Sequence, residues 1–214
     1  MSEMNTSSPN PKIMAREIIR RVSAKLDPRW IESASAQIAE RVMALPAVQS
    51  AGMIGCYLAM PHEVQTSGLI NRLLAAGKRL CVPAWNQGTA GYSMCEFAAN
   101  EPMHPGHHGV YQPLHPRWLM MNVDAMIVPV VAFDRYLQRL GHGGGNFDRL
   151  LSSHVGPKIG LAFEAQRLAV VPVEPHDVPL NFVVTEQRVY DGTNEWAELI
   201  DAPKAMTQNA GVPA

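Results

Sequence analysis

The stretch VDAMIVPVVAFDRYLQRLGHGGGNFDRLL, residues 123–151, contains the features that decide the fold. It begins with the most strongly apolar run of the chain, 123–133, which predicts a central strand buried on both faces. Four of the five residues over 141–145 are glycine, and 147–155 has the apolar spacing of a short helix. A strand, a glycine loop and a helix in this order are typical of α/β domains, in which ligands bind at the carboxyl ends of parallel strands.

The sequence on either side alternates helices with strands. Helices are predicted over 12–25, 28–45 and 67–78; the second begins with Asp27-Pro28, a pair typical of helix N-termini. The predicted strands cover 52–60, 79–85, 92–97, 157–163, 181–186 and 188–190, and a long connection covers 98–117. We therefore expect a three-layer α/β fold, Rossmann-like, with a mostly parallel sheet and helices on both faces.

Length and composition indicate a single globular domain. The 214 residues suit a single domain, expected over 11–200, with residues 1–10 and 201–214 as disordered ends. The net charge of −1 argues against a nucleic-acid partner, and no apolar run reaches the roughly 18 residues that span a membrane. Cys56, Cys81 and Cys95 lie in apolar runs without a Cys-x-x-Cys pair, which favours reduced thiols and a cytoplasmic location.

The glycine loop suggests an anion site. Glycines between a strand and a helix expose backbone N–H groups, and the positive end of the helix dipole adds to their attraction for phosphate. The spacing fits neither common nucleotide fingerprint, because Asn146, Phe147 and Asp148 stand where those motifs need glycine, lysine or a hydroxyl. By pattern alone, a phosphate site and a merely tight turn both remain open.

Residues 128–151 also resemble the signature of 5-formyltetrahydrofolate cyclo-ligases, which runs approximately P-x-x-A-F-D-x-x-G-x-R-L-G-x-G-G-G-x-Y-D-R. Other pieces of the family pattern follow in its order: Lys12-x-x-x-Arg16, YLAMPHEVQT at 57–66, AGKRLCVP at 76–83, GVYQP at 109–113, IGLAFEAQ at 159–166 and HDVPLNFVVT at 176–185. The resemblance covers about residues 12–190. It implies a fold similar to that of the sugar-phosphate isomerases and CoA-transferases.

The resemblance implies an ATP-dependent ring closure. In this family the formyl oxygen of 5-formyltetrahydrofolate attacks the γ-phosphate of ATP, and the second folate nitrogen then attacks the phosphorylated imidate. Phosphate leaves, and 5,10-methenyltetrahydrofolate and ADP are the other products. The expected partners are therefore a reduced folate and ATP, with Mg²⁺ as cofactor, on a protein that is a monomer or a weak homo-oligomer.

Family positions carried over to this sequence define a candidate site. Lys12 and Arg139 would be catalytic residues whose positive charges contact the phosphates, and Asp148 and Asp177 would bind Mg²⁺. Without the resemblance, Lys12 and Arg16 would be a solvated basic face. Asp148 would be a helix N-cap and Asp177 a turn former. The folate would contact Leu58, Glu63 and Phe147. The nucleotide would contact Lys12, Arg16, Arg139, Leu140, Gly141, His142, Gly143, Gly144, Gly145, Asn146 and Phe147.

Three residues depart from the family pattern. Leu137 replaces a glycine; if that position has φ > 0, leucine would be strained there and the turn rearranged. Asn146 and Phe147 stand where the family has tyrosines, so a hydroxyl is lost. Gln65 replaces an acidic residue that need not face the ligand. The alternative functions are a paralogue that binds a nucleotide or folate without ring closure, and an α/β domain acting on another phosphorylated substrate.

Overall fold

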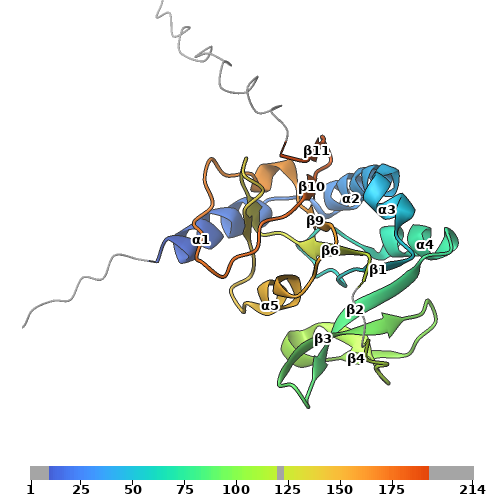
Figure 1. Cartoon of the computed structure of the whole chain (residues 1–214). Coiled ribbons are helices and arrows are strands. Elements are labelled where there is room, and N and C mark those ends of the chain that lie inside the picture. Colours follow the sequence, from blue (N-terminus) through green and yellow to red (C-terminus); the bar gives the residue numbers. More distant parts are fainter. Residues whose placement is uncertain (1–9, 120–122, 193–214) are drawn as a thin grey trace, which may run out of the picture.

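A seven-stranded sheet forms the centre of the computed structural model, which describes residues 10–119 and 123–192 (Figure 1). The strand order is β11-β10-β9-β6-β1-β2-β3. The inner strands β10, β9, β6, β1 and β2 are parallel, and β3 and β11 pair antiparallel at the two edges. The bounds are β1 (Met53–Gly55), β2 (Arg79–Asn86), β3 (Gly91–Phe97), β6 (Ala125–Pro129), β9 (Lys158–Leu161), β10 (Phe182–Val184) and β11 (Val189–Tyr190).

The predicted α/β class is therefore confirmed, and the sheet topology marks a place for a ligand. The strand order reverses between β6 and β1, since β2 follows on one side and β9 on the other. Loops leaving the carboxyl ends of two such strands diverge and open a crevice. The ends predicted to be disordered, 1–10 and 201–214, lie outside the described residues except for Asn10, which caps α1. No helix among the described residues is long and apolar enough to cross a bilayer.

Helices and loops cover both faces of the sheet. Along β6, Ile127 faces a core shared with α2 (Pro28–Ala44) and α4 (Ser67–Ala75), and α3 (Pro46–Ser50) joins α2 on this face. Val128 faces a second core, to which α5 (Asn146–Ser152) contributes Leu151. All five residues of β6 are buried, as predicted for a central strand.

The apolar run over 123–133 was expected to be one strand, and this prediction is wrong. Strand β6 ends at Pro129, which has no N–H to donate, and the chain then forms a hairpin of β7 (Ala132–Phe133) and β8 (Arg139–Leu140). Helix α1 (Pro11–Ser23) buries Ala15 and Ile19 against this hairpin. Because both strands are buried, the apolar pattern continues through the break and conceals it.

Two further elements differ from the prediction. Strand β1 has only three residues, since beyond Cys56 the chain leaves the sheet toward the crevice. The connection over 98–117 contains a second hairpin, of β4 (Met103–Pro105) and β5 (Tyr111–Pro113), around the short 3-10 helix η1 (His107–Gly109). A second 3-10 helix, η2 (Glu164–Gln166), follows β9.

Leu137 takes the left-handed conformation that was expected of its glycine counterpart, with φ +58°. The turn is nevertheless well formed, because the Asp134 carboxylate accepts hydrogen bonds from the N–H groups of Tyr136 and Gln138 at 2.9 and 3.1 Å. The leucine side chain is buried in the second core. Its burial offsets the roughly 1–2 kcal/mol that the left-handed conformation costs, so the expected rearrangement of the turn does not occur.

We expect Leu137→Gly to destabilise the fold, because removing a buried leucine costs about 2–5 kcal/mol and relieving the strain returns only about 1–2 kcal/mol. Ala90 is the matched control, since it also has a positive φ, of 48°, but is exposed. Ala90→Gly should leave the free energy of unfolding within about 1 kcal/mol of the wild type. Urea denaturation measures both values, and a Leu137→Gly protein as stable as the wild type would contradict this account.

Candidate functional site

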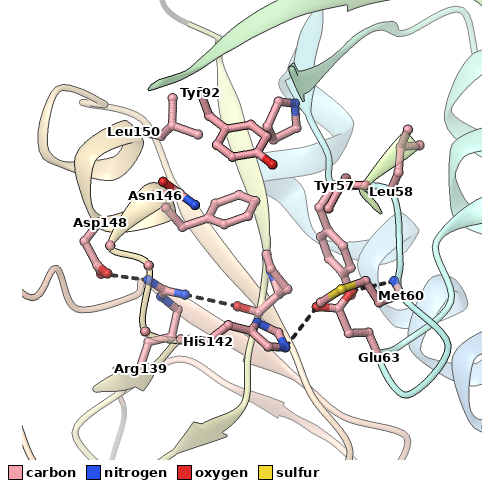
Figure 2. A pocket seen from close by; sticks show the side chains of 18 residues that line it. Tyr57, Leu58, Met60, Glu63, Tyr92, Arg139, His142, Asn146, Asp148 and Leu150 are labelled. Atoms are coloured by element: carbon pink, nitrogen blue, oxygen red, sulfur yellow. Dashed lines mark hydrogen bonds and ion pairs between the residues drawn. The ribbon is translucent and has the colours of Figure 1, made fainter. Parts of the chain in front are cut away.

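A cavity of about 380 Å³ lies at the carboxyl ends of β1, β2 and β6, where the strand order reverses (Figure 2). One wall follows β1, and the opposite wall is the glycine loop with the start of α5. The lining residues are Tyr57, Leu58, Met60, Glu63, Pro83, Tyr92, Val110, Pro129, Arg139, Gly141, His142, Gly143, Gly144, Gly145, Asn146, Phe147, Asp148 and Leu150. Most of the predicted site residues therefore meet in one cavity.

The glycines of the loop are required by their neighbours and by their backbone conformation. A Cβ on Gly141 would lie 2.7 Å from the Arg139 Nη1 atom, so any side chain there displaces the guanidinium. Gly143 and Gly145 have φ of +105° and +64°, which disfavour other residues. Helix α5 has only seven residues, so its dipole would add little to the attraction of an anion, and the loop N–H groups would be the main donors to one.

Arg139 forms the charged floor of the cavity. Its side chain is 2% exposed, and its Nη2 donates to the Asp148 Oδ1 at 2.7 Å while Nη1 donates to the Pro129 carbonyl at 3.3 Å. The Nε atom is buried and has no hydrogen-bond partner among the described residues. The guanidinium carbon lies 6.0 Å from the centre of the Phe147 ring. Arg139 is thus fixed in place with donor capacity left unused.

Lys12 and Arg16, the two positively charged residues of α1 that were predicted to contact the nucleotide, lie one helical turn apart and bind different partners. Arg16 donates from Nε to the Gly141 carbonyl at 2.8 Å, which places its charge against the glycine loop. The Lys12 ammonium lies 2.7 Å from Glu174 and 2.6 Å from Asp177. Burial acts to lower the pKa of Lys12, but the hydrogen bonds to Asp177 and Glu174 outweigh it and raise this pKa.

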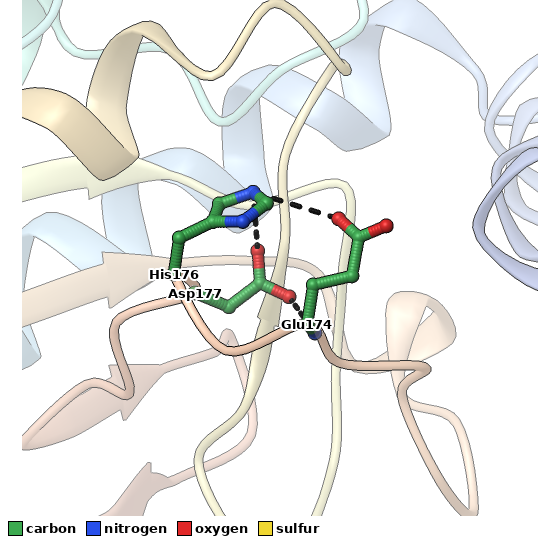
Figure 3. A group of neighbouring side chains, drawn as sticks. All are labelled: Glu174, His176 and Asp177. Atoms are coloured by element: carbon green, nitrogen blue, oxygen red, sulfur yellow. Dashed lines mark hydrogen bonds and ion pairs between the residues drawn. The ribbon is translucent and has the colours of Figure 1, made fainter.

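The two predicted metal ligands lie in separate ion-pair groups. Asp148 pairs with Arg139 in the cavity, whereas Asp177 pairs with Lys12. Within residues 10–119 and 123–192, the side chains grouped closely enough to share a cation are Glu174, His176 and Asp177, and Asp148 is not among them (Figure 3). Four predicted site residues, Lys12, Arg16, Leu140 and Asp177, are not among the residues that line the cavity. Leu140 is instead buried in an apolar cluster with Ala15 and Ile19 of α1.

Glu63 occupies the wall opposite Arg139. Its Oε2 accepts the Met60 N–H at 2.7 Å, and its Oε1 lies 3.6 Å from the His142 Nε2. Burial raises the pKa of Glu63 to about 7, although the Met60 hydrogen bond acts in the opposite direction. Gln65 is not among the residues that line the cavity, and its amide donates to the carbonyls of Met60 and Glu63 at 2.9 and 2.8 Å. It braces the turn that presents Glu63.

Apolar side chains complete the cavity. Leu58 packs on the first core at the end of the β1 segment, and Phe147 packs between the two cores. Tyr57, Met60, Tyr92 and other lining residues were missed in the sequence because each reads as ordinary core or loop. Glu174, the second partner of Lys12, was also missed, although its place three residues before Asp177 was a usable signal.

Comparison with known proteins identifies the family. The sequence matches the model of the 5-formyltetrahydrofolate cyclo-ligase family over residues 11–186. It is 33% identical over 181 residues to a 5-formyltetrahydrofolate cyclo-ligase of Escherichia coli K12, covering 81% of this chain and 100% of that protein. A 5-formyltetrahydrofolate cyclo-ligase of Haemophilus influenzae is 28% identical over 172 residues, covering 77% and 92% of the two chains.

Solved structures agree with this assignment. The fold is similar to that of an Aquifex aeolicus 5,10-methenyltetrahydrofolate synthetase, with a TM-score of 0.76 and 26% identity over 86% of this chain and 94% of that one. A Mycoplasma pneumoniae 5,10-methenyltetrahydrofolate synthetase has the same fold, with a TM-score of 0.64 and 20% identity over 83% and 99% of the chains. The chain belongs to the 5-formyltetrahydrofolate cyclo-ligase family.

Proposed function

We propose that this ligase converts 5-formyltetrahydrofolate to 5,10-methenyltetrahydrofolate in an ATP- and Mg²⁺-dependent reaction that releases ADP and phosphate. One observation carries the proposal: one wall of the cavity is the glycine loop with the Arg139 guanidinium beside it, and the opposite wall carries the largely buried Glu63 carboxylate. The first wall suits a phosphate chain, and the second suits a ligand rich in N–H donors. We place the reaction in the cytoplasm, which the three buried, unpaired cysteines fit.

The nucleotide phosphates would lie along the glycine loop. Backbone N–H groups at 141–145 donate to phosphate oxygens, and Arg139 and Arg16 supply positive charge from its two sides. Lys12 stands one turn before Arg16 on α1 and adds a third base near the loop. Arg139 is already held by a buried ion pair, so it needs no reorganisation to stabilise charge on the transferred phosphoryl group.

Asp148 and Asp177 are the candidate ligands of a magnesium ion. Mg²⁺ prefers carboxylate oxygens and binds together with substrate phosphates, so each carboxylate would contribute from its own ion-pair group while phosphate oxygens of ATP complete the coordination. The bound ion would neutralise charge on the phosphates of ATP. In the structure Asp148 is paired with Arg139 and Asp177 with Lys12, so each carboxylate would share its oxygens between that partner and the ion.

The pterin would bind at the opposite wall. Its adjacent ring N–H and amino group are two parallel donors, which match the two oxygens of an ionised Glu63 carboxylate. Leu58 and Phe147 would pack on the apolar faces of the folate. The formyl oxygen is a weak nucleophile, so the main task of these residues is to hold it in line with the γ-phosphate until the second nitrogen closes the ring.

The non-catalytic alternative rested on Leu137, Asn146 and Phe147. The hairpin with Leu137 is well formed and delivers Arg139 to the cavity, so Asn146 and Phe147 are the departures that still favour this alternative. Phe147 keeps the apolar contact of a tyrosine and lacks its hydroxyl, a loss typically worth about 1.5–3 kcal/mol where the bond is to a charged group. We therefore expect a slower enzyme rather than an inactive one.

The direct test is to incubate the purified protein with 5-formyltetrahydrofolate, ATP and Mg²⁺ and follow the near-ultraviolet absorbance of the methenyl product. We expect ATP-dependent product formation that Arg139→Met lowers by a factor of about 10²–10³, because it removes a preorganised charge. If the wild type and Phe147→Tyr both form no product while ATP still raises the melting temperature, the binding-only function replaces this one.

A second prediction concerns the loop. Gly141→Ala should weaken ATP binding about tenfold or more, because the added Cβ would lie 2.7 Å from the Arg139 Nη1. Gly68→Ala is the matched control: a Cβ at that position in α4 has no atom within 4 Å and should stabilise the helix by about 1 kcal/mol without changing ATP affinity. Calorimetric titration with ATP measures both, and equal ATP affinity in the two variants would contradict the assigned role of the loop.

A further inference from the structure

Asp134 is a buried residue whose carboxylate joins two separate segments of the chain. It lies in the turn of the β7–β8 hairpin, is 1% exposed and is not among the residues that line the cavity. Its Oδ1 accepts the N–H groups of Tyr136 and Gln138 at 2.9 and 3.1 Å, within the turn. Its Oδ2 accepts the N–H of Val171 at 2.8 Å, 37 residues further along the chain. Both oxygens are therefore used, each for a different segment.

The Oδ1 bonds hold the turn that leads into Arg139. Gln138 directly precedes Arg139, which is the β8 residue that lines the cavity and pairs with Asp148. The turn also contains Leu137 in its left-handed conformation, and the two bonds keep the turn closed around it. One oxygen of Asp134 thus fixes the start of the strand that delivers the Arg139 guanidinium.

The Oδ2 bond holds an irregular segment that lies beside the hairpin. Residues 168–180, all of them described, form no helix or strand. The two ends of this segment bind hairpin carbonyls, since the Leu168 N–H donates at 2.8 Å and the Leu180 N–H at 3.0 Å. Between these ends the Val171 N–H binds Asp134, and the Val171 side chain is buried in the apolar cluster that α1 forms with the hairpin. Asp134 is thus an anchor within the irregular segment.

The irregular segment carries both acidic partners of Lys12. Glu174 follows Val171 by three residues and Asp177 follows it by six (Figure 3). Their carboxylates lie 2.7 and 2.6 Å from the Lys12 ammonium, and we call these three residues the Lys12 group. Short stretches of chain therefore connect the anchoring carboxylate to Arg139 on one side and to the Lys12 group on the other.

We propose that Asp134 is a positioning residue for the reaction: by binding the hairpin turn with one oxygen and the irregular segment with the other, it sets the spacing between Arg139 and the Lys12 group. This inference rests on the proposed function, which assigns the ATP phosphates and Mg²⁺ to groups on these two segments. A displacement of about 1 Å in such groups is enough to cost about 10²-fold in rate. A carboxylate suits the task because it has two acceptor oxygens, whereas an amide of the same shape has one.

Asp134→Asn separates the two bonds. The amide oxygen binds two N–H groups if it faces the turn and one if it faces Val171, so it should face the turn and leave the amide NH₂ against the Val171 N–H. In hydrogen exchange followed by NMR, the Val171 amide should exchange about tenfold faster than in the wild type, with Gln138 within about threefold. Leu168 is the internal control, since its N–H binds a backbone carbonyl. Unchanged exchange at Val171, or equal acceleration at all three amides, would overturn the proposal.

Val171→Pro tests the same bond from the other side in a protein that keeps the carboxylate, because proline has no N–H. The two substitutions remove one shared interaction, so the free energy of unfolding lost by the double variant should be smaller than the sum of the two single losses. Urea denaturation of the wild type and the three variants measures this difference. Additive losses would show that Asp134 and Val171 act independently, contrary to the proposal.

The functional readout is the Mg²⁺ requirement. Asp134→Asn should lower kcat about tenfold and raise the Mg²⁺ concentration for half-maximal activity about threefold or more, with the KM for 5-formyltetrahydrofolate within about twofold. Partial unfolding would lower kcat alone, so a lower kcat at an unchanged Mg²⁺ requirement would refute the positioning role. Asp124→Asn is the matched control: the Asp124 Oδ2 accepts the N–H groups of Gly52 and Met53 at 2.8 and 2.9 Å, at the amino ends of β1 and β6, away from the cavity. It should leave the Mg²⁺ requirement unchanged.

The measurements separate the possible failures. A wild type that forms no methenyl product, together with faster Val171 exchange in Asp134→Asn, would refute the proposed reaction and leave the link between the two segments intact. An active wild type whose kcat and Mg²⁺ requirement are both unaffected by Asp134→Asn, despite faster Val171 exchange, would refute the positioning role and leave the proposed function standing.

Discussion

Arg139 and Asp148 form a 2.7 Å ion pair that closes the two ends of the glycine loop onto each other. Arg139 comes from hairpin strand β8 and Asp148 from the first turn of α5, so this one contact fixes the path of the five residues between the hairpin and the helix. Breaking a buried pair by removing one partner typically costs about 3–5 kcal/mol, because the remaining charge is left uncompensated. Gly141 is a consequence of the same pair, since a side chain there would displace the guanidinium.

The rest of the site is arranged around this fixed charge. Helix α1 packs on the hairpin that carries Arg139, and this packing brings Arg16 to the loop and Lys12 to Glu174 and Asp177. The reversal of strand order between β6 and β1 places Glu63 on the opposite wall. A glycine-rich half that carries Arg139 and an acidic half that carries Glu63 thus come from distant parts of the chain and share one cavity of about 380 Å³.

Leu137 illustrates how a departure from a family motif can be accommodated. The residue has the positive φ that a glycine would take without cost, and the expected consequence was a rearranged turn. The turn persists because Asp134 binds its backbone and because the leucine side chain is buried. The sequence showed the local conflict between leucine and the turn. Only the packing around the turn showed what offsets it.

The sequence by itself determined the α/β class, the glycine loop and the basic and acidic residues close to that loop in the chain, since these follow from local periodicity and from motifs of short spacing. The tertiary structure decided where the apolar run over 123–133 breaks into β6 and β7, because both strands are buried and look alike in sequence. It also decided that Lys12 pairs with Asp177 and that His142 meets Glu63. These partners are far apart along the chain, and only the packing of α1 on the hairpin and the reversal of strand order bring them together.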